Sequence, residues 1–247
     1  METVSQEFDL PPPPRRSHPK DIEVPEAVYR RGTTLDLYAS VGTGMVVIRN
    51  KKRLRVRSAR RSQIVLAGVK ESSVTSCPVE TKVVAKFFDP LFVSGFGNEV
   101  AAYSSLCPLQ GSVVPIFYGE YACHFADRPI EADQTVKVIL MEHIDGWPLS
   151  WYQHGELTES QEQWIERQAY AIMGQVHSHG VIHGDLALRN FLLTKTGRMV
   201  LVDFEESEIL NGQNEFSPED LKEEDNIVLS CQLEDFRLLH GGASTSH

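Results

Sequence analysis

Three polar side chains in the second half of the chain stand at a spacing that suits metal and phosphate chemistry. Asp185 is followed five residues later by Asn190, and Asp203 comes thirteen residues after that. Short apolar runs flank them, and the turn-forming segment 195–198 separates two of these runs, which predicts short strands and a hairpin. Such a hairpin would bring two carboxylates and an amide to one sheet edge, an oxygen-rich site for Mg²⁺ and phosphate oxygens.

The residues around these positions resemble two motifs of the protein-kinase-like superfamily. HGDLALRN at 183–190 is similar to the catalytic loop H-R-D-x-x-x-x-N, and VDFE at 202–205 is similar to the metal-binding motif D-F-G. This version of the motifs is closer to small atypical and fungal-type kinase-like proteins, and it is also similar to aminoglycoside- and choline-type phosphotransferases. The resemblance covers residues 62 to 206.

The resemblance implies a bilobal α+β fold, with an antiparallel-sheet N-lobe and a truncated, mainly helical C-lobe. It divides the chain into a disordered Pro-rich leader at 1–27, an extension with a basic segment at 28–61, an N-lobe at 62–144, a minimal C-lobe at 145–240 and a tail at 241–247.

The resemblance also implies roles for the residues of the two motifs. Asp185 would orient or accept the proton of an attacking hydroxyl, and Arg189 would lie near the γ-phosphate. Asn190 and Asp203 would ligate Mg²⁺. Leu192 would form the floor under the adenine ring. Taken singly, either carboxylate is as well explained as an ordinary turn residue.

A candidate ion pair lies in the strand-rich half. Lys86 in VVAKFF resembles the lysine of V-A-I-K, which contacts the α- and β-phosphates. Alternation places it on one strand face with Val84 and Phe88, although a lone lysine in a strand is often only an exposed edge residue. Glu99, in a helix expected at 98–106 with Asn98 as its cap, is the natural partner of Lys86. A first-turn glutamate is also favoured by the helix dipole alone.

The phosphate-covering loop of kinases has a degenerate counterpart here. We expect a turn at 69–73 between strands at 63–68 and 74–79, followed by a strand at 81–88. In this arrangement Gly68, Ser72 and Ser73 would contact phosphate. The loop has one glycine where kinases carry several, whereas the Gly-x-Gly at 42–44 is interpreted as a turn between strands at 35–41 and 45–49.

The hinge between the lobes is expected after a strand at 135–142. By resemblance, Met141 would stand at the back of the adenine pocket, and the backbone of Glu142 and Ile144 would bond the adenine edge. A further strand is expected at 113–118.

Two helices are predicted in the second half. The stretch 158–179 keeps an apolar stripe at helical spacing and ends before Gly180, with His177 and His179 favourable at its C-terminus. The stretch 220–239 is predicted to be one amphipathic helix. Its inward-facing residues are expected to be Leu221, Val228, Cys231 or Gln232, and Phe236.

Composition limits the partners and the compartment. The net charge of −10 argues against nucleic acid as a general partner. The sequence contains no run of eighteen apolar residues, so no membrane span is predicted. The N-terminus lacks the apolar core of a signal peptide. The four cysteines are scattered without a C-x-x-C pair, which favours reduced thiols in a cytoplasmic or nuclear, not secreted, protein.

One segment departs from the acidic average. Eight of the thirteen residues from 49 to 61 are basic. The functional interpretations are a nuclear-import signal or an anion-binding arm, and the simpler one, which we favour, is a solvated hairpin or flexible arm.

These patterns predict an ATP- and Mg²⁺-dependent phosphotransferase that acts on a hydroxyl of a protein or a small molecule. The alternative is a pseudokinase that serves as a nucleotide-binding or protein-interaction module, and a nucleic-acid binder is a weaker third. Two departures from kinases bear on regulation. Gly184 replaces the arginine that pairs with a phosphorylated activation loop, and Glu205 replaces the glycine after Asp-Phe, which should stiffen that turn.

Overall fold

The computed structural model describes residues 31–40, 43–56, 62–88, 93–123, 136–152, 157–210 and 217–240. The expected leader, tail and second half of the basic run lie outside these residues. The chain divides into two compact units. One comprises residues 18–101 and 116–143, and the other comprises residues 1–17, 102–115 and 144–247.

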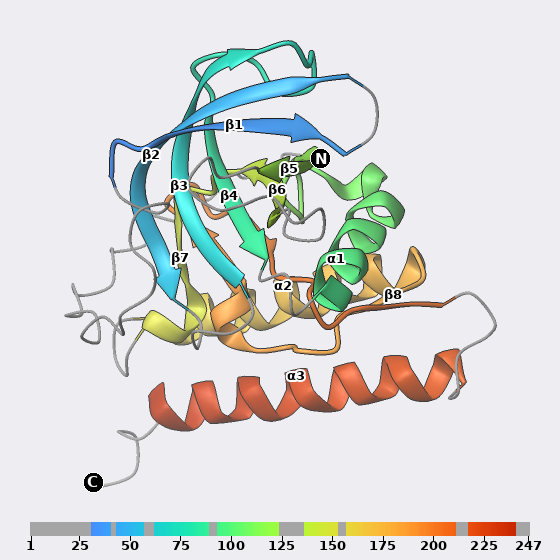
Figure 1. The fold of residues 1–247 in the computed structure, drawn as a ribbon. Helices are drawn as coiled ribbons and strands as arrows, with labels where there is room; N and C mark the ends of the chain where they lie inside the picture. The colour runs from blue at the N-terminus through green and yellow to red at the C-terminus, as the bar shows by residue number, and fades with distance from the viewer. Residues whose placement is uncertain are drawn as a thin grey trace, which may run out of the picture. The chain divides into compact units, whose positions relative to one another are not determined.

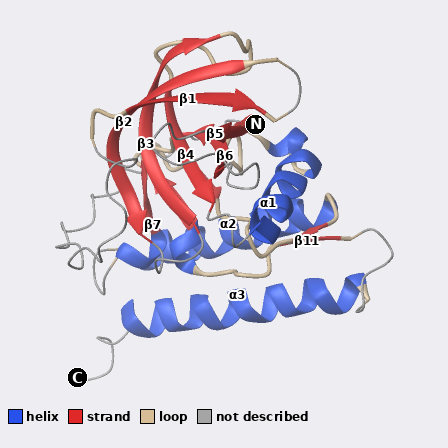
Figure 2. Ribbon diagram, in the orientation of Figure 1, coloured by secondary structure: helices blue, strands red, loops and turns tan. Residues whose placement is uncertain are grey.

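The first unit is built on a closed barrel of six antiparallel strands (Figures 1 and 2). Its strands are β1 (Thr34–Ala39), β2 (Met45–Val56), β3 (Ser62–Ser72), β4 (Lys82–Phe88), β5 (Phe117–Cys123) and β6 (Val136–Glu142). Their order is β1-β2-β3-β4-β6-β5, and β1 pairs with β5 to close the barrel. Residues 34–56, expected in an extension, therefore contribute two barrel strands.

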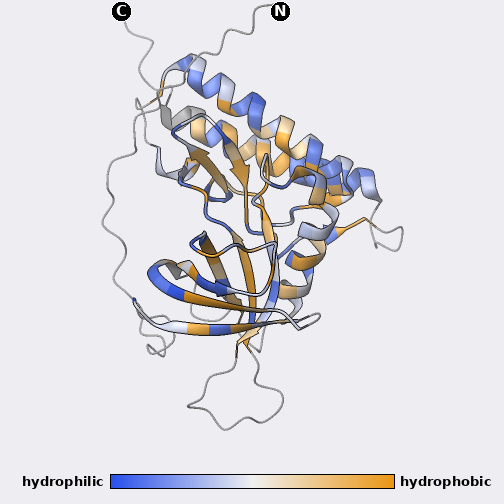
Figure 3. Cartoon of the chain, turned by 90° about the horizontal axis from the view of Figure 1, so that it is seen from above, coloured by the Kyte–Doolittle hydropathy of each residue, from blue (hydrophilic) through white to orange (hydrophobic). Residues whose placement is uncertain are grey.

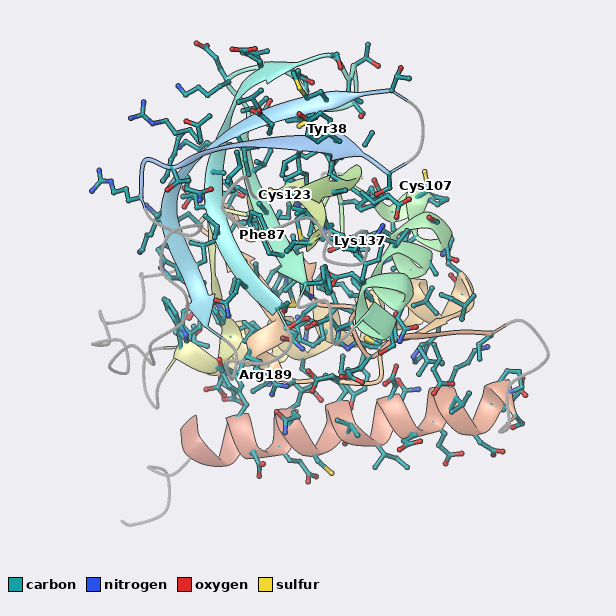
Figure 4. All side chains as sticks on the ribbon, viewed as in Figure 1. Tyr38, Phe87, Cys107, Cys123, Lys137 and Arg189 are labelled. Atoms are coloured by element: carbon teal, nitrogen blue, oxygen red, sulfur yellow. The ribbon has the colours of Figure 1, made fainter. Side chains whose placement is uncertain are left out.

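Alternation along the strands fills the barrel interior. Val65, Ala67 and Val69 of β3 and Val83 and Ala85 of β4 are buried in one apolar cluster, while the residues between them face outward. Phe87 and Cys123, labelled in Figure 4, belong to the same cluster. Hydrophobic and hydrophilic residues accordingly follow one another along the strands in Figure 3.

Two strand predictions in this unit are wrong. The expected turn at 69–73 is absent, because β3 continues to Ser72, and residues 74–79 form turns instead of a strand. The strand expected at 113–118 begins only at Phe117, since residues 111–113 form a turn. The β-branched residues at 74, 75 and 79 therefore do not pair with β4. The strands expected near 45, 82 and 136 are confirmed.

Helix α1 (Val93–Ser105) begins earlier than expected. Asn98 lies inside the helix, so its predicted role as the cap is wrong, and Glu99 is not a first-turn residue. The glycines at 95 and 97, which suggest a loop in the sequence, are helical here. Residues 93–101 belong to the first unit and 102–105 to the second.

The second unit contains the remaining helices and short strands. These are the 3₁₀ turns η1 (Cys107–Leu109), η2 (Leu149–Trp151) and η3 (Leu188–Asn190), the strands β7 (Gly146–Pro148), β8 (Val181–Ile182), β9 (Phe191–Thr194), β10 (Met199–Leu201) and β11 (Glu208–Ile209), and the helices α2 (Glu159–Ser178) and α3 (Pro218–His240). Strands β10, β9 and β7 form one small sheet, and β11 pairs with β8.

Helix α2 confirms its prediction closely. Thr158 is the N-cap and forms a capping box with Gln161, which satisfies backbone amides at the helix start. The apolar stripe, including Ile165, Ala169 and Ile172, is buried. Gly180 follows the helix with φ of 71°, a left-handed conformation that suits glycine.

Helix α3 confirms the predicted element and, with Leu221 and Phe236, part of its predicted buried face. Its buried residues are Leu221, Asp225, Leu229, Leu233 and Phe236, whereas the expected Val228 and Cys231 are exposed. The prediction is wrong for Val228 and Cys231, because it assumed that only apolar side chains face inward. In the structure the buried face includes Asp225.

All four cysteines are free. Burial raises the pKa of Cys77 to about 11 and that of Cys123 to about 12, so both remain protonated thiols. Within the described residues, no helix is both long enough and apolar enough to cross a membrane.

Candidate functional site

The loop between β8 and β9 holds the candidate catalytic aspartate. The side-chain Nη2 of Arg189, four residues further along, donates to Asp185 Oδ1 at 2.6 Å and to Oδ2 at 2.8 Å. The short 3₁₀ turn η3 makes this contact, because it folds residues 188–190 back toward the aspartate. Both side chains remain partly exposed, at 38% for Arg189 and 29% for Asp185. The carboxylate is thus oriented by an arginine, and its remaining lone pairs can accept a hydroxyl proton.

Asn190 ties the same loop to the following hairpin. Its Nδ2 donates to the backbone oxygen of Asp185 at 2.8 Å, and its own backbone oxygen accepts from Val202 N at 2.9 Å. The β9–β10 register, in which Phe191 faces Leu201, therefore sets Asn190 beside the residue that precedes Asp203. The predicted hairpin is confirmed, and it brings the backbone of Asn190 close to that of Asp203, the other candidate metal ligand.

Two features of these residues fit a bound cation. Asn190 Oδ1 is buried and accepts no hydrogen bond from any described residue, and such an oxygen is costly unless something binds it. Asp203 has φ of 76°, a left-handed conformation that costs about 1–2 kcal/mol for an L-residue. A carboxylate and an amide oxygen are ligands that Mg²⁺ accepts, and it takes the rest from water and phosphate. Among the described residues, no group of three His, Cys, Asp or Glu side chains could hold a metal without such help.

A neutral histidine supports this loop from inside. His183 is fully buried, and burial lowers the pKa of its imidazole. Its Nε2 lies 3.2 Å from the backbone oxygen of Val202, so Nε2 must donate, while Nδ1 accepts weakly from Asp185 N at 3.4 Å. Phe204 packs at 5.0 Å from the His183 ring and at 5.5 Å from the Tyr103 ring. His183 is therefore a buried structural histidine, and Phe204 packs against it beneath the loop.

Asp225 of α3 anchors the loop, although the sequence patterns did not single it out. Its Oδ2 accepts from His183 N at 2.8 Å and its Oδ1 from Gly184 N at 3.4 Å. His177 Nε2 lies 3.1 Å from the same carboxylate. For His177 we expected only a favourable position at the helix C-terminus. Its side chain also contacts the Asp225 carboxylate and helps to hold it in place. The signal in the sequence was an aspartate at i+4 from Leu221 and i−4 from Leu229, within an apolar stripe.

The glycine at 184 has a structural reason. Its φ is 72°, and a Cβ built there would lie 2.1 Å from the backbone oxygen of Glu206. No larger residue fits without moving that backbone. The arginine found in many kinases is thus excluded by local geometry.

In the first unit, the structure pairs the candidate lysine with the candidate glutamate. The Lys86 ammonium donates to Glu99 Oε2, and both side chains are almost completely buried. Phe88 lies beside the pair, with its ring centroid 5.2 Å from Lys86 Nζ and 5.3 Å from the ring of Phe96. The ammonium is therefore fixed on the outer side of β4 and held by α1.

The cross-strand register reveals apolar companions of Lys86. On the outer face of the barrel, Leu66 of β3 pairs with Val84 of β4, and Val84 pairs with Met141 of β6. Val84 lies two residues before Lys86 on the same face of β4. Met141 is buried, and Leu66 and Val84 are half-buried. An apolar surface beside an ammonium suits an adenine ring and its phosphates. The alternation in β3 and β4 could have identified Leu66 and Val84.

The same register corrects the expected phosphate loop. Gly68 is paired with Lys82, four residues along β4 from Lys86, and Ser72 lies further in the same direction. At about 3.3 Å per residue, Gly68 is some 13 Å from the register position of Lys86. The Ser72 hydroxyl donates to the backbone oxygen of Val74, and the Ser73 hydroxyl donates to the backbone oxygen of Met45. The loop predicted for Gly68, Ser72 and Ser73 is therefore wrong. The segment joining β2 to β3, nearer Lys86, is outside the described residues.

Three further candidates occupy regular positions. Glu142 ends β6, and its backbone N donates to Ile116 O at 2.8 Å, which engages that donor within the barrel unit. Leu192 lies half-buried in β9, on the face opposite to the buried Phe191 and Leu193. Ile144 is buried in the second unit.

Comparison with known proteins agrees with this geometry. The family model of the ABC1 atypical kinase-like domain matches residues 130–214, which include the loop and hairpin of Asp185, Asn190 and Asp203. Protein kinase kin1 of Schizosaccharomyces pombe is 32% identical over 96 residues, covering 38% of this chain and 10% of that protein. These matches support assignment of the chain to the protein-kinase-like superfamily.

Two further relatives also match only part of the chain. A probable cAMP-dependent protein kinase catalytic subunit of Encephalitozoon cuniculi is 30% identical over 118 residues, 43% of this chain and 37% of that protein. A probable bifunctional tRNA threonylcarbamoyladenosine biosynthesis protein of Methanosarcina barkeri is 33% identical over 81 residues, 33% of this chain and 13% of that protein. The chain thus matches only about a tenth to just over a third of the length of these relatives.

Proposed function

We propose that this kinase-like chain transfers the γ-phosphate of ATP to a hydroxyl group. The observation that carries the proposal is the loop-and-hairpin geometry of the second unit. It joins an arginine-oriented carboxylate, Asp185, to a buried amide oxygen without a partner, Asn190 Oδ1, and to Asp203 in a strained backbone conformation.

The two compact units correspond, in this proposal, to an N-lobe and a truncated C-lobe. In the N-lobe, Lys86, held by Glu99, contacts the α- and β-phosphates, while Leu66, Val84 and Met141 cover the adenine. Ile144 and the carbonyl of Glu142 bond the adenine edge, and Leu192 underlies the ring.

In the C-lobe, Asn190 and Asp203 hold Mg²⁺. The ion supplies neutralisation of phosphate charge when it is bound. Asp185 orients the acceptor hydroxyl and takes its proton as the new oxygen–phosphorus bond forms, while the bond between the γ-phosphorus and the bridging oxygen breaks and ADP leaves. Arg189 keeps the Asp185 carboxylate in one orientation and offers its other guanidinium N–H groups to the γ-phosphate.

The acceptor is a protein or small-molecule hydroxyl. We favour a protein, because the relatives in Schizosaccharomyces pombe and Encephalitozoon cuniculi are named as protein kinases. The cytoplasm or nucleus remains the predicted location.

Turnover tests the proposal. With Mg²⁺ and ATP, replacing Asp185 by Asn should lower phosphate transfer by about 10²–10⁴-fold, since a general base is lost. ATP binding should remain within about twofold. The exposed Asp145→Asn variant is the matched control and should keep full activity. Transfer that survives both Asp185→Asn and Asp203→Asn would remove the enzyme proposal.

One observation favours the second candidate, a pseudokinase. The phosphate loop expected at 68–73 is absent, and β3 occupies most of that segment. A pseudokinase should gain thermal stability with ATP and Mg²⁺ but show no transfer in any variant. The same assays therefore separate the two functions.

A further inference from the structure

The first half of the basic run lies on strand β2 of the barrel. Arg49, Lys51 and Lys52 lie on β2, within a closed barrel, and all three side chains are exposed. The interpretation of this half as a flexible arm is therefore wrong. A register shift at Lys51, between Asn50 and Lys52, sets two successive lysines on the outer side of the strand.

Neighbouring strands add cations to the same face. Arg49 faces Gly68 of β3, and Gly68 faces Lys82 of β4, so the three residues form one cross-strand row. Lys70, two residues from Gly68 on the same side of β3, is also exposed. We call Arg49, Lys51, Lys52, Lys70 and Lys82 the basic face.

Gly68 brings these charges closer together. A Cβ at Gly68 would lie 2.8 Å from Lys51 Cε and 3.0 Å from its Nζ, so the lysine stem lies across the glycine. Arg49 and Lys82 flank the same glycine from strands about 10 Å apart. In this structure Gly68 therefore makes room for the Lys51 side chain, in place of the predicted contact with nucleotide phosphate.

Within the part of the chain that the structure describes, the cations of the basic face have no ion-pair partner. Asp36 and Glu71 face Val47 in the next outward row and mark one boundary of the face. Like charges gathered on adjacent strands are unfavourable, and a chain of net charge −10 gains nothing in solubility from them.

We propose that the basic face docks an acidic segment of a partner protein. The barrel is closed, so a peptide cannot add as a further strand and must be held through side-chain charge. Four of the five cations are lysines, which act as point charges and accept carboxylates at variable spacing. On a chain that is otherwise acidic, such a face orients an acidic partner as well as attracting it.

Other polyanions fit the basic face less well. Single-stranded nucleic acid is held largely by stacking on aromatic rings. Among the described residues, no exposed aromatic side chain lies on β2, β3 or β4. The apolar neighbours of the cations, Leu66 and Val84, are half-buried, so they offer no fully exposed apolar side chain for insertion into a membrane.

Fluorescence anisotropy of a labelled peptide tests this docking surface without nucleotide, so its result does not depend on phosphotransfer. The probe alternates Glu with Ser, and a control peptide carries Gln in place of Glu. The whole chain should bind the Glu peptide at least about tenfold more tightly than the Gln peptide, and added salt should weaken binding.

Matched variants locate the binding. Replacing Lys51, Lys52 and Lys82 by Gln should weaken binding at least about tenfold. Removing the same number of charges elsewhere, at Arg167, Lys195 and Lys222, should change it less than about twofold. The single change Lys82→Glu gives the same direction with little risk to folding, and Glu71→Gln should strengthen binding.

Three results would overturn the proposal. They are equal binding of the Glu and Gln peptides, equal loss in the two triple variants, and tighter binding of single-stranded RNA or anionic vesicles than of the Glu peptide at equal charge concentration.

Discussion

At the scale of single residues, the two candidate halves of the site are held in different ways. Lys86 and Glu99 form a buried ion pair, so each depends on the other for its charge. Asp185 and Arg189 form a partly exposed pair, which water can still reach. The first pair is therefore a matter of stability as well as function, whereas the second mainly sets orientation.

The buried pair makes a direct stability prediction. Lys86→Met leaves the Glu99 carboxylate buried without its cation, and should lower the free energy of unfolding by about 3–5 kcal/mol. Urea denaturation measures this. The double variant Lys86→Met, Glu99→Gln removes the uncompensated charge and should recover part of the loss. A single variant as stable as the wild type would show that the pair is not formed in solution.

His183 makes a prediction about pH. Its pKa is lowered by burial, so the unfolded chain binds up to one proton more than the folded chain between the folded-state pKa and the ordinary value of about 6.5. Stability therefore falls as the pH drops below this value, by up to about 1.4 kcal/mol per pH unit from this group, and does not change above it. In a ¹⁵N NMR titration, His183 should gain its second proton only at a lower pH than a histidine of the unfolded chain, and its neutral form should carry the proton on Nε2. A His183 that titrates at or above the pH of a histidine in the unfolded chain would contradict the assignment.

At the scale of elements, helix α3 does more than cover the second unit. Its Asp225 receives two backbone N–H groups of the candidate catalytic loop, and His177 of α2 also contacts it. The loop conformation at 183–184 therefore depends on a helix that begins more than thirty residues later.

Asp225→Ala should thus disturb both stability and the loop. It leaves buried donors without an acceptor, at about 1–3 kcal/mol for each unsatisfied group. Thermal unfolding should show the loss, and amide exchange of residues 183–184 should become faster. Asp235→Ala, an exposed residue of the same helix, is the control. Equal stability of the two variants would mean that the anchor contributes nothing.

Some elements could be predicted from local patterns, and some could not. Helix α2 has a capping box and a clear apolar stripe, and the hairpin around 195–198 has short apolar strands and turn residues, so their structure is encoded locally. The turn at 74–80 contains β-branched residues, and α1 contains two early glycines, so tertiary contacts override local preference there.

The candidate site divides in the same manner. The partnership of Lys86 with Glu99 and the hairpin linking Asn190 to Asp203 were predictable because they follow motif spacing. Asp225 was not, because its importance comes from contacts 41 and 42 residues away in the chain. Gly68 was assigned to phosphate because the length of β3, and hence the register, cannot be seen in a short apolar run.

At the scale of the whole molecule, charge is distributed unevenly over the two units. The barrel unit carries the basic face, while α3 in the second unit has acidic residues in its first turn and at exposed positions 223, 224, 234 and 235. Both units lie in one chain of 247 residues with a net charge of −10. Among the described residues, the basic face is a cationic surface on a chain of negative net charge, and we propose that this surface, not the average charge, selects partners.

The central claim is that Asn190 and Asp203 hold a metal-bound nucleotide. Isothermal titration of ATP, with and without Mg²⁺, tests it most directly. We predict that Mg²⁺ strengthens ATP binding to the wild-type chain, and that Asp203→Asn reduces this metal-dependent gain at least about tenfold while the exposed Asp145→Asn retains it. Equal metal-dependent gains in all three proteins would contradict the account.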